Sequence, residues 1–477
     1  MTAEIEARQS ASGLRSECLT FSEILAQSIA NIAPTLTPTV NAALVFASAG
    51  SGTWLTFVFA TVGLVLVGLN INQFARRSAS PGSLYAYIAR GLGPTAGVLT
   101  GWALVLAYML TAMAVLCGFA NYGNVLLGLV GLQASPIFLY SICAGIAWYV
   151  GYRDIRLSTV LMLALEGLSV GLILILGLIV FSKHGFSIDT SQLTLQGASP
   201  EGIRLGLVLA VFSYVGFESA TSLGDEAKNP LQLIPRAVII STVISGLFFI
   251  VLSYIEVLGF EGYKTSFDKT EAPLNVLANL VGVGFFGILI SIGAMISFFA
   301  CALASINAGA RIFFSMARHG IFHPSVGKAH GTNETPHVAL TMAALIVFII
   351  PASVSMFGVK VLDSYGYFGT IATYGFLLAY ILISVAAPVY LYRQRNLRLG
   401  DVVIAALAVV FMIIPVVGSV YPVPPAPYNV FPYLFLMYLV VGGGWFLMLR
   451  LHSPEIIENM EQDIEAIHTK FNDMKKV

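Results

Sequence analysis

Residues 212–219 read FSYVGFES, and they lie in the middle of a long apolar segment, residues 203–224. A membrane-spanning helix needs roughly 20 mostly apolar residues, so this segment is long enough to cross a bilayer. Glycine weakens a helix, and a carboxylate inside the bilayer is costly and by default marks a functional site. Broken backbone at membrane depth is tolerated only where it faces protein or a cavity. The stretch therefore predicts a helix interrupted near Gly216, beside a cavity inside a membrane protein.

A second interruption is predicted at residues 30–38, which read ANIAPTLTP. Its two prolines, four residues apart, each remove a helical hydrogen bond. Taken alone, the stretch at residues 30–38 is explained by an ordinary proline kink. The stretch at residues 212–219, taken alone, is explained by a tight helix crossing at Gly216. The two interruptions fall in the first and sixth apolar segments, and paired breaks of this kind point to a carrier's binding site. Half-helix N-termini suit a carboxylate, and free carbonyls with Glu218 suit an ammonium group, so the two breaks together suit a zwitterion.

The composition is that of an integral membrane protein. Of the 477 residues, 57% are hydrophobic and 10% are charged, and the mean hydropathy is +0.85. Soluble domains carry about 25% charged residues. The formal net charge of zero gives no bulk attraction to nucleic acid. We place twelve membrane-spanning segments at residues 22–48, 54–75, 95–127, 135–151, 157–181, 203–224, 234–259, 279–310, 336–354, 366–390, 400–420 and 430–450.

The distribution of basic residues predicts the orientation in a plasma or inner membrane. An even number of spans places both termini on one side. If that side is the cytoplasm, 19 of the 24 lysines and arginines fall in inner segments, and the outer ones are Lys183, Arg204, Lys264, Lys269 and Lys360. Because cytoplasmic loops favour lysine and arginine, we expect both termini to be cytoplasmic. Residues 1–21 form a polar tail, and an apolar stripe at helical spacing predicts an amphipathic surface helix at 453–477.

Two carboxylates, Glu166 and Glu218, fall well inside the predicted spans, and Glu256 lies near an outer end. Every lysine, arginine and histidine is assigned to a loop, a tail or a span end, so we expect no buried cation to pair with the two glutamates. Each could be protonated, bind a metal cation such as sodium, or meet a cationic substrate. The plainer alternative is a neutral glutamic acid that hydrogen-bonds the backbone of a neighbouring helix.

Motifs of other protein classes are missing from the sequence. It has no H-E-x-x-H motif, no glycine-rich phosphate loop and no metal-type spacing of its four cysteines. We therefore expect no cofactor, no metal site and no catalytic residues, and a nucleotide-driven pump is disfavoured. A receptor or scaffold with a transporter fold remains an alternative to a carrier.

Several motifs in order resemble the amino acid–polyamine–organocation family of permeases. They are SYVGFES at 213–219, DEAKNP at 225–230, IPRA at 234–237, PGSLYAY at 81–87, GLGP at 91–94, ARHG at 317–320 and TPH at 335–337. The resemblance covers nearly the whole chain. It implies an all-α fold of twelve helices with a five-plus-five inverted-repeat core of the LeuT type and two additional C-terminal helices. The repeats would span residues 22–181 and 203–390, with the last two spans at 400–450.

The resemblance also implies alternating access around a central site between the broken first and sixth spans. The residues expected to bind substrate are Ile32, Ala33, Pro34, Thr35, Ser213, Tyr214, Val215, Gly216 and Phe217. Glu218 matches a glutamate tied to gating or proton coupling. Glu166 falls at or next to a position where some proton-coupled relatives carry a lysine, so that lysine mechanism does not carry over. Ser305 is expected to face Glu166.

The sequence departs from the family in the first break, where Pro34-Thr35-Leu36 replaces a Gly-Ser-Gly-like run and limits close backbone approach. We interpret the chain as a secondary carrier for a small amino acid, driven by protons. The missing glycines and the two unpaired glutamates favour the alternative of an amine or polyamine carrier. A sodium-coupled amino acid symporter is the other alternative. The expected partners are the substrate, a proton or sodium ion, and membrane lipid.

Overall fold

The computed structural model describes residue 14, residues 18–153 and 155–452, and residues 457 and 460. Most of the predicted polar tail at 1–21 and of the amphipathic helix at 453–477 lies outside these residues. The described residues form helices and connecting segments without any β-strand, apart from one isolated bridge between Leu19 and Ala227.

The first half of the chain contains a set of helices joined by short turns. They are α2 (Phe21–Ile32), η1 (Thr37–Asn41), α3 (Ala42–Ala49), η2 (Gly50–Gly52), α4 (Thr53–Ala75), α5 (Ser83–Leu92), α6 (Pro94–Gly128), α7 (Pro136–Arg153), α8 (Ile155–Lys183) and α9 (Thr190–Leu193).

The second half continues in the same way. Its helices are α10 (Pro200–Phe212), η3 (Ser219–Leu223), α11 (Pro230–Gly259), η4 (Phe267–Lys269), α12 (Pro273–Leu280), α13 (Gly284–Arg318), η5 (Pro324–Gly327), α14 (His337–Met356), α15 (Val361–Arg393), α16 (Leu399–Gly418), η6 (Tyr428–Val430) and α17 (Phe431–His452). Across both halves α6, α7, α10, α11 and α12 begin with proline, which is favoured there because the first helical N–H has no intrahelical partner.

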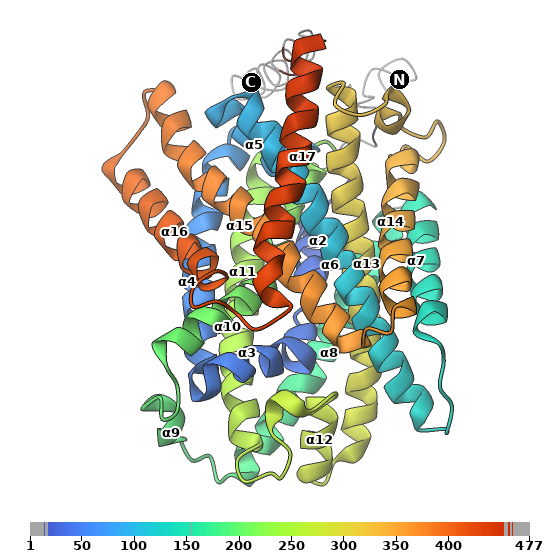
Figure 1. Cartoon of the computed structure of the whole chain (residues 1–477), viewed down its shortest axis with the longest axis vertical. Helices are drawn as coiled ribbons and strands as arrows, with labels where there is room; N and C mark the ends of the chain where they lie inside the picture. Colours follow the sequence, from blue (N-terminus) through green and yellow to red (C-terminus); the bar gives the residue numbers. More distant parts are fainter. Residues whose placement is uncertain (1–13, 15–17, 154, 453–456, 458–459, 461–477) are drawn as a thin grey trace.

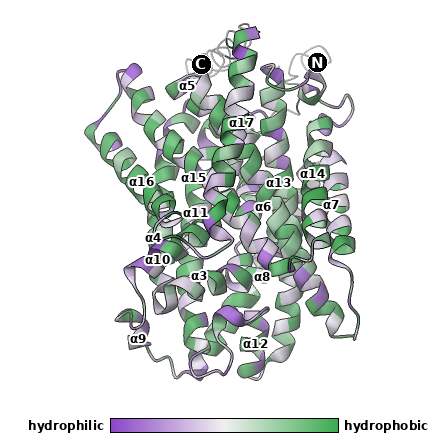
Figure 2. Cartoon of the chain, viewed as in Figure 1, coloured by the Kyte–Doolittle hydropathy of each residue, from purple (hydrophilic) through white to green (hydrophobic). Residues whose placement is uncertain are grey.

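Nine helical stretches in the described part of the chain are long and apolar enough to cross a membrane by length and composition. The first of them, Phe21–Ala75, takes in two of the predicted spans. The long helices are mainly hydrophobic along their lengths, whereas the connection around α9 is more hydrophilic (Figure 2). The prediction of an all-helical integral membrane protein is therefore confirmed.

Burial separates central from peripheral helices. In the most apolar part of α6, 94% of the residues are buried, against 22% in α16 and 17% in the stretch that contains α17. Helix α6 packs against both α13 and α15, and these three helices form the centre of the molecule. The exposed apolar faces of α16 and α17 suit contact with lipid.

The molecule is elongated, and its two ends differ (Figure 1). Helix α17 finishes at the end where α5 lies, whereas α9 and α12 lie at the opposite end, called the α9–α12 end below. Helices α2 and α10 both stop between these two ends, and the interruptions that follow them form the candidate site.

Candidate functional site

The first predicted interruption is present between α2 and η1. Helix α2 ends at Ile32, and Ala33 takes a left-handed conformation with φ 48° while its N–H donates to the Ile29 carbonyl at 2.8 Å. The Leu36 N–H then donates to the Ala33 carbonyl at 2.8 Å, which closes a tight turn. The chain resumes as η1, a π-helical turn that begins immediately before Pro38. The two prolines therefore bracket a segment with irregular, buried backbone.

The second predicted interruption follows α10, which ends at Phe212. Residues 213–218 form turns, and Gly216 has φ 88°, a conformation that residues with a side chain rarely adopt. A β-carbon at Gly216 would lie 2.3 Å from Nδ2 of Asn31. Gly216 is therefore needed both for its backbone angle and for the contact between the two interruptions.

Serine hydroxyls join the two broken segments. The Ser28 hydroxyl donates to the Phe217 carbonyl at 2.7 Å and accepts from the Ala220 N–H at 3.3 Å. The Ser219 hydroxyl donates to the Gln27 carbonyl at 3.2 Å. These bonds satisfy backbone groups that the broken helices leave open, and they fix the two segments against each other.

Glu218 is buried and held by two phenols. The Tyr108 hydroxyl of α6 donates to Oε1 at 2.7 Å, and the Tyr380 hydroxyl of α15 donates to Oε2 at 2.8 Å. Glu218 therefore connects the second interruption to two of the three central helices. Two of its hydrogen bonds come from side chains, and the backbone of Gly216 also lies beside its carboxyl.

Glu166 of α8 lies at the first interruption. Its Oε1 accepts a hydrogen bond of 2.8 Å from the Thr35 N–H. The hydroxyls of Thr35 and Ser297 lie beside the same carboxyl. Ser305, expected to face Glu166, donates its hydroxyl to Oδ1 of Asn31 at 2.6 Å instead. Asn31 thus contacts both Ser305 and Gly216, and its position inside the predicted break is the signal that could have marked it as a site residue.

Other predicted site residues point in different directions. The Tyr214 hydroxyl lies 2.6 Å from the Thr61 hydroxyl of α4, and its ring packs edge-on against Phe249. The Phe217 ring lies 5.3 Å from the Tyr380 ring. The Ser213 hydroxyl accepts a 3.0 Å hydrogen bond from Nδ2 of Asn41. All nine residues predicted to bind substrate are buried, namely Ile32, Ala33, Pro34, Thr35, Ser213, Tyr214, Val215, Gly216 and Phe217.

Several buried polar atoms around the first interruption have no hydrogen-bond partner among the described residues. They are Oγ1 of Thr37 and Nδ2 of Asn31, together with the hydroxyls of Thr35 and Ser297, which lie beside Glu166 without completing a hydrogen bond. Buried polar groups are nearly always hydrogen-bonded, so a cluster of open donors and acceptors indicates a ligand or water site. Within the described residues, no group of three or more histidine, cysteine, aspartate or glutamate side chains could hold a metal ion.

Arg311, assigned from the sequence to a span end, is a buried cation, but it does not pair with Glu166 or Glu218. This residue lies inside α13 with 3% side-chain exposure, and its Nη2 lies 2.9 Å from Oε1 of Glu226. The Arg311 Nε–H donates to Oε2 of Glu226 at 3.1 Å, which makes the pair bidentate. Sequence reasoning missed the pair because both residues fall at predicted span boundaries and are 85 positions apart.

These features define a membrane protein with many helices. Two of these helices are interrupted in the interior, and the interrupted segments contact each other. The chain belongs to the amino acid permease family, which matches residues 23–453. The resemblance to amino acid–polyamine–organocation permeases is thereby confirmed.

Similar proteins are named as transporters of several small solutes. The branched-chain amino acid permease BcaP of Bacillus subtilis (strain 168) is 25% identical over 437 residues, which is 85% of this chain and 87% of that protein. The low-affinity putrescine importer PlaP of Escherichia coli (strain K12) is 26% identical over 362 residues, 72% of this chain and 75% of that protein. A methylthioribose transporter of B. subtilis is 22% identical over 427 residues, 85% of this chain and 87% of its own length.

Proposed function

We propose that this chain is a secondary active transporter that moves a small amino acid across the membrane by alternating access. The observation that carries the proposal is the meeting of the two interrupted helices at Asn31 and Gly216. Unpartnered buried atoms of Asn31 and Thr35 lie at the same place. Such breaks at membrane depth need a protein or cavity environment, and they provide free backbone groups for both ends of a zwitterion.

The architecture we propose has twelve membrane spans, with an inverted repeat of residues 22–181 and 203–390 followed by two spans at 400–450. The positions of the two breaks, one near the start of each half, support this arrangement. The excess of lysine and arginine in the predicted inner segments supports cytoplasmic termini.

We propose further that transport is coupled to protons through Glu218, with Glu166 tuning the first interruption. Glu218 contacts α6 and α15 through Tyr108 and Tyr380, so a change in its charge would act on three elements at once. Sodium bound at Glu166 is the alternative coupling.

An amine such as putrescine is the second candidate substrate. It is favoured by the similarity to PlaP and by the absence of glycine from residues 34–36, which carry Pro34, Thr35 and Leu36 in the first break. Glycine lets the backbone come close enough to bind an α-carboxylate. An amine has no α-carboxylate, so the absence of these glycines does not lower its affinity.

Counterflow in liposomes tests the proposal. Purified protein in vesicles loaded with unlabelled leucine or putrescine should accumulate the labelled form of one of them, and protein-free vesicles should not. Binding of a substrate without counterflow would contradict a carrier and favour a receptor.

A further inference from the structure

Glu256 is a buried carboxyl that the site described above does not use. It lies near the end of α11 with 1% exposure, and neither carboxyl oxygen has a hydrogen-bond partner among the described residues. Glu166 accepts a backbone N–H, and Glu218 accepts two phenols, so each of these has donors within bonding distance. Glu256 therefore differs from both glutamates of the candidate site.

The described residues around Glu256 offer it no countercharge. The elements packed on α11 are α2, α4, α8, α12, η1 and η3. Among their described side chains, the charged ones are Glu23 of α2, and Glu166 and exposed Lys183 of α8, and none of them forms an ion pair with Glu256. On α11 itself the other titratable residues are Arg236, near the opposite end of the helix, and Tyr254, and neither is paired with Glu256.

Two further observations describe the packing around Glu256. The Tyr122 phenol of α6 is close enough to interact electrostatically with it, and donates its own hydrogen bond to the Thr39 carbonyl at 2.9 Å. One turn further along α11, Gly259 lies beside the apolar side chains of Val180 and Leu277. A hard metal cation such as Ca²⁺ takes about six to eight oxygen ligands, which this largely apolar environment does not offer.

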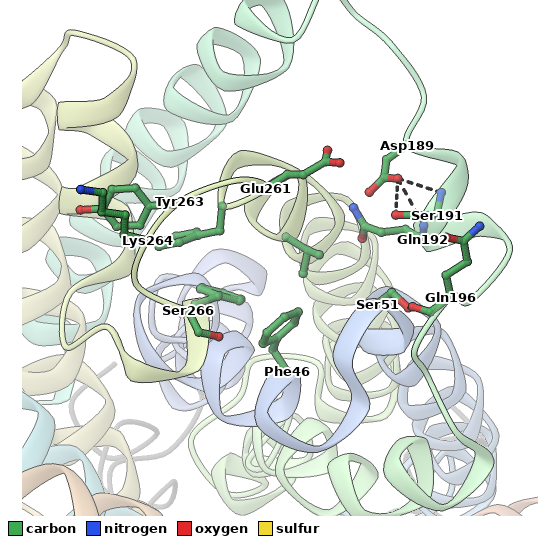
Figure 3. A pocket seen from close by; sticks show the side chains of 13 residues that line it. Phe46, Ser51, Asp189, Ser191, Gln192, Gln196, Glu261, Tyr263, Lys264 and Ser266 are labelled. Carbon is green, nitrogen blue, oxygen red and sulfur yellow. Dashed lines mark hydrogen bonds between the residues drawn. The ribbon is translucent and has the colours of Figure 1, made fainter.

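A pocket of about 430 Å³ opens at the α9–α12 end, beside the last turn of α11. Figure 3 shows Asp189 and Gln192 on one side of it, Glu261 above the opening, and Lys264 on the far side. Val257, the residue after Glu256, also lines it. The pocket therefore reaches the residue next to Glu256 along α11, while Glu256 itself stays buried.

The rim of this pocket is anionic on the side nearest α9. Partial burial raises the pKa of Asp189, but hydrogen bonds from Ser191 and Gln192 outweigh this and hold the pKa below its ordinary value. Asp189 is thus charged at neutral pH, and Glu261 is exposed. The Asp189 N–H donates to the Tyr254 hydroxyl at 2.7 Å, so this rim is attached to α11 two residues before Glu256. Negative charge at a pocket mouth concentrates protons and other cations there.

We propose that Glu256 is a proton-binding site that exchanges protons through this pocket with the solution at the α9–α12 end. An unpaired ionised carboxyl in an apolar interior is costly, and such a group is neutralised instead of remaining charged. A proton is the one cation that needs no ligand cage, which is why it fits Glu256. The inference rests on the proposed carrier function only for its physiological role, because protonation itself is measurable without transport.

Infrared spectroscopy of the purified full-length protein tests the protonation directly. At neutral pH, the wild type should show the C=O stretching band of a protonated carboxylic acid that shifts on exchange into D₂O. Glu256→Gln should lose a component of that band, and the control Glu261→Gln, one turn away and exposed, should keep it. A band unchanged in Glu256→Gln overturns the proposal.

Transport then separates failure of this site from failure of the carrier function. Making the solution at the α9–α12 end alkaline should deprotonate Glu256 and change wild-type uptake by up to about tenfold per pH unit, the limit for one titrating group. Glu256→Gln should weaken this dependence, leaving the share that Glu218 contributes, while counterflow persists, and Glu256→Asp should restore part of it. Retention of the full pH dependence by Glu256→Gln overturns the proposed exchange. If the wild type shows no transport but Glu256→Gln loses the infrared component, the carrier function is refuted and the proton site at Glu256 stands.

Discussion

Gly216 is the residue at which the two broken helices come closest. Its φ of 88° and the 2.3 Å approach of Asn31 leave no room for a side chain. We expect Gly216→Leu to abolish substrate binding while the protein stays folded, at a cost in stability of about 1–3 kcal/mol, the usual cost of overpacking. Ligand-induced shifts in thermal unfolding measure this.

The matched control is Gly443→Leu in α17, because a β-carbon there would meet no other group within 4 Å. It should unfold as the wild type does and keep its ligand-induced shift. Normal ligand affinity in Gly216→Leu would remove the basis for placing the site at this contact.

Thr35 offers a hydroxyl that lies beside the Glu166 carboxyl but completes no hydrogen bond with a described group. Thr35→Val keeps the shape of the side chain, so we expect stability to be unchanged. If the hydroxyl binds the polar end of the substrate, affinity should fall by about 0.5–1.5 kcal/mol, roughly two- to tenfold, as for one neutral hydrogen bond. Titration calorimetry with the substrate found in counterflow measures the change.

Thr39→Val is the contrasting variant, because the Thr39 hydroxyl already donates to the Thr35 carbonyl at 2.9 Å. It should alter stability more than affinity. Unchanged affinity of Thr35→Val for every ligand would show that the substrate lies elsewhere along the first interruption.

At the scale of elements, the sequence predicted both interruptions, because proline and glycine act through local backbone geometry. Pro34 and Gly216 disfavour a continuous helix in any context. The direction of a side chain such as Tyr214 could not be predicted, because it depends on which helix packs alongside. Tertiary packing also explains why Glu256 is buried without a partner and why Arg311 pairs with the distant Glu226. Local sequence patterns contain no information about such packing.

The Arg311–Glu226 pair fastens α13 to the segment between η3 and α11. The Glu226 carbonyl also accepts hydrogen bonds from the N–H groups of Cys18 and Leu19, at 2.8 and 2.9 Å. Removing one partner of a buried ion pair leaves an uncompensated charge, so we expect Glu226→Gln to destabilise the fold by about 3–5 kcal/mol. Thermal or denaturant unfolding in detergent measures this.

Glu201→Gln, at an exposed acidic residue, is the control and should change little. The double variant Glu226→Gln/Arg311→Met removes both charges, and it should recover part of the stability lost in Glu226→Gln. Equal stability of Glu226→Gln and the wild type would mean that the pair does not hold these elements together.

At the scale of the whole molecule, coupling depends on how a local charge change reaches several helices. Glu218 is the residue best placed for this, because Tyr108 and Tyr380 connect it to α6 and α15. Protonation turns one carboxyl oxygen from an acceptor into a donor. One of the two phenols then loses its hydrogen-bond acceptor. The contacts between the second interruption and the central helices would then loosen, and this is the kind of differential interaction that can shift a conformational equilibrium.

We therefore expect uptake into liposomes to respond to an imposed pH gradient in the absence of sodium, and Glu218→Gln to weaken that response. Gln keeps the size of the side chain and cannot be ionised, so its effect reports on the proton and not on packing. Glu166→Gln provides the comparison, since sodium at Glu166 is the alternative and would be lost in that variant. Uptake that depends on sodium and ignores the pH gradient, in both the wild type and Glu218→Gln, would overturn the proton assignment and favour Glu166 as the ion site.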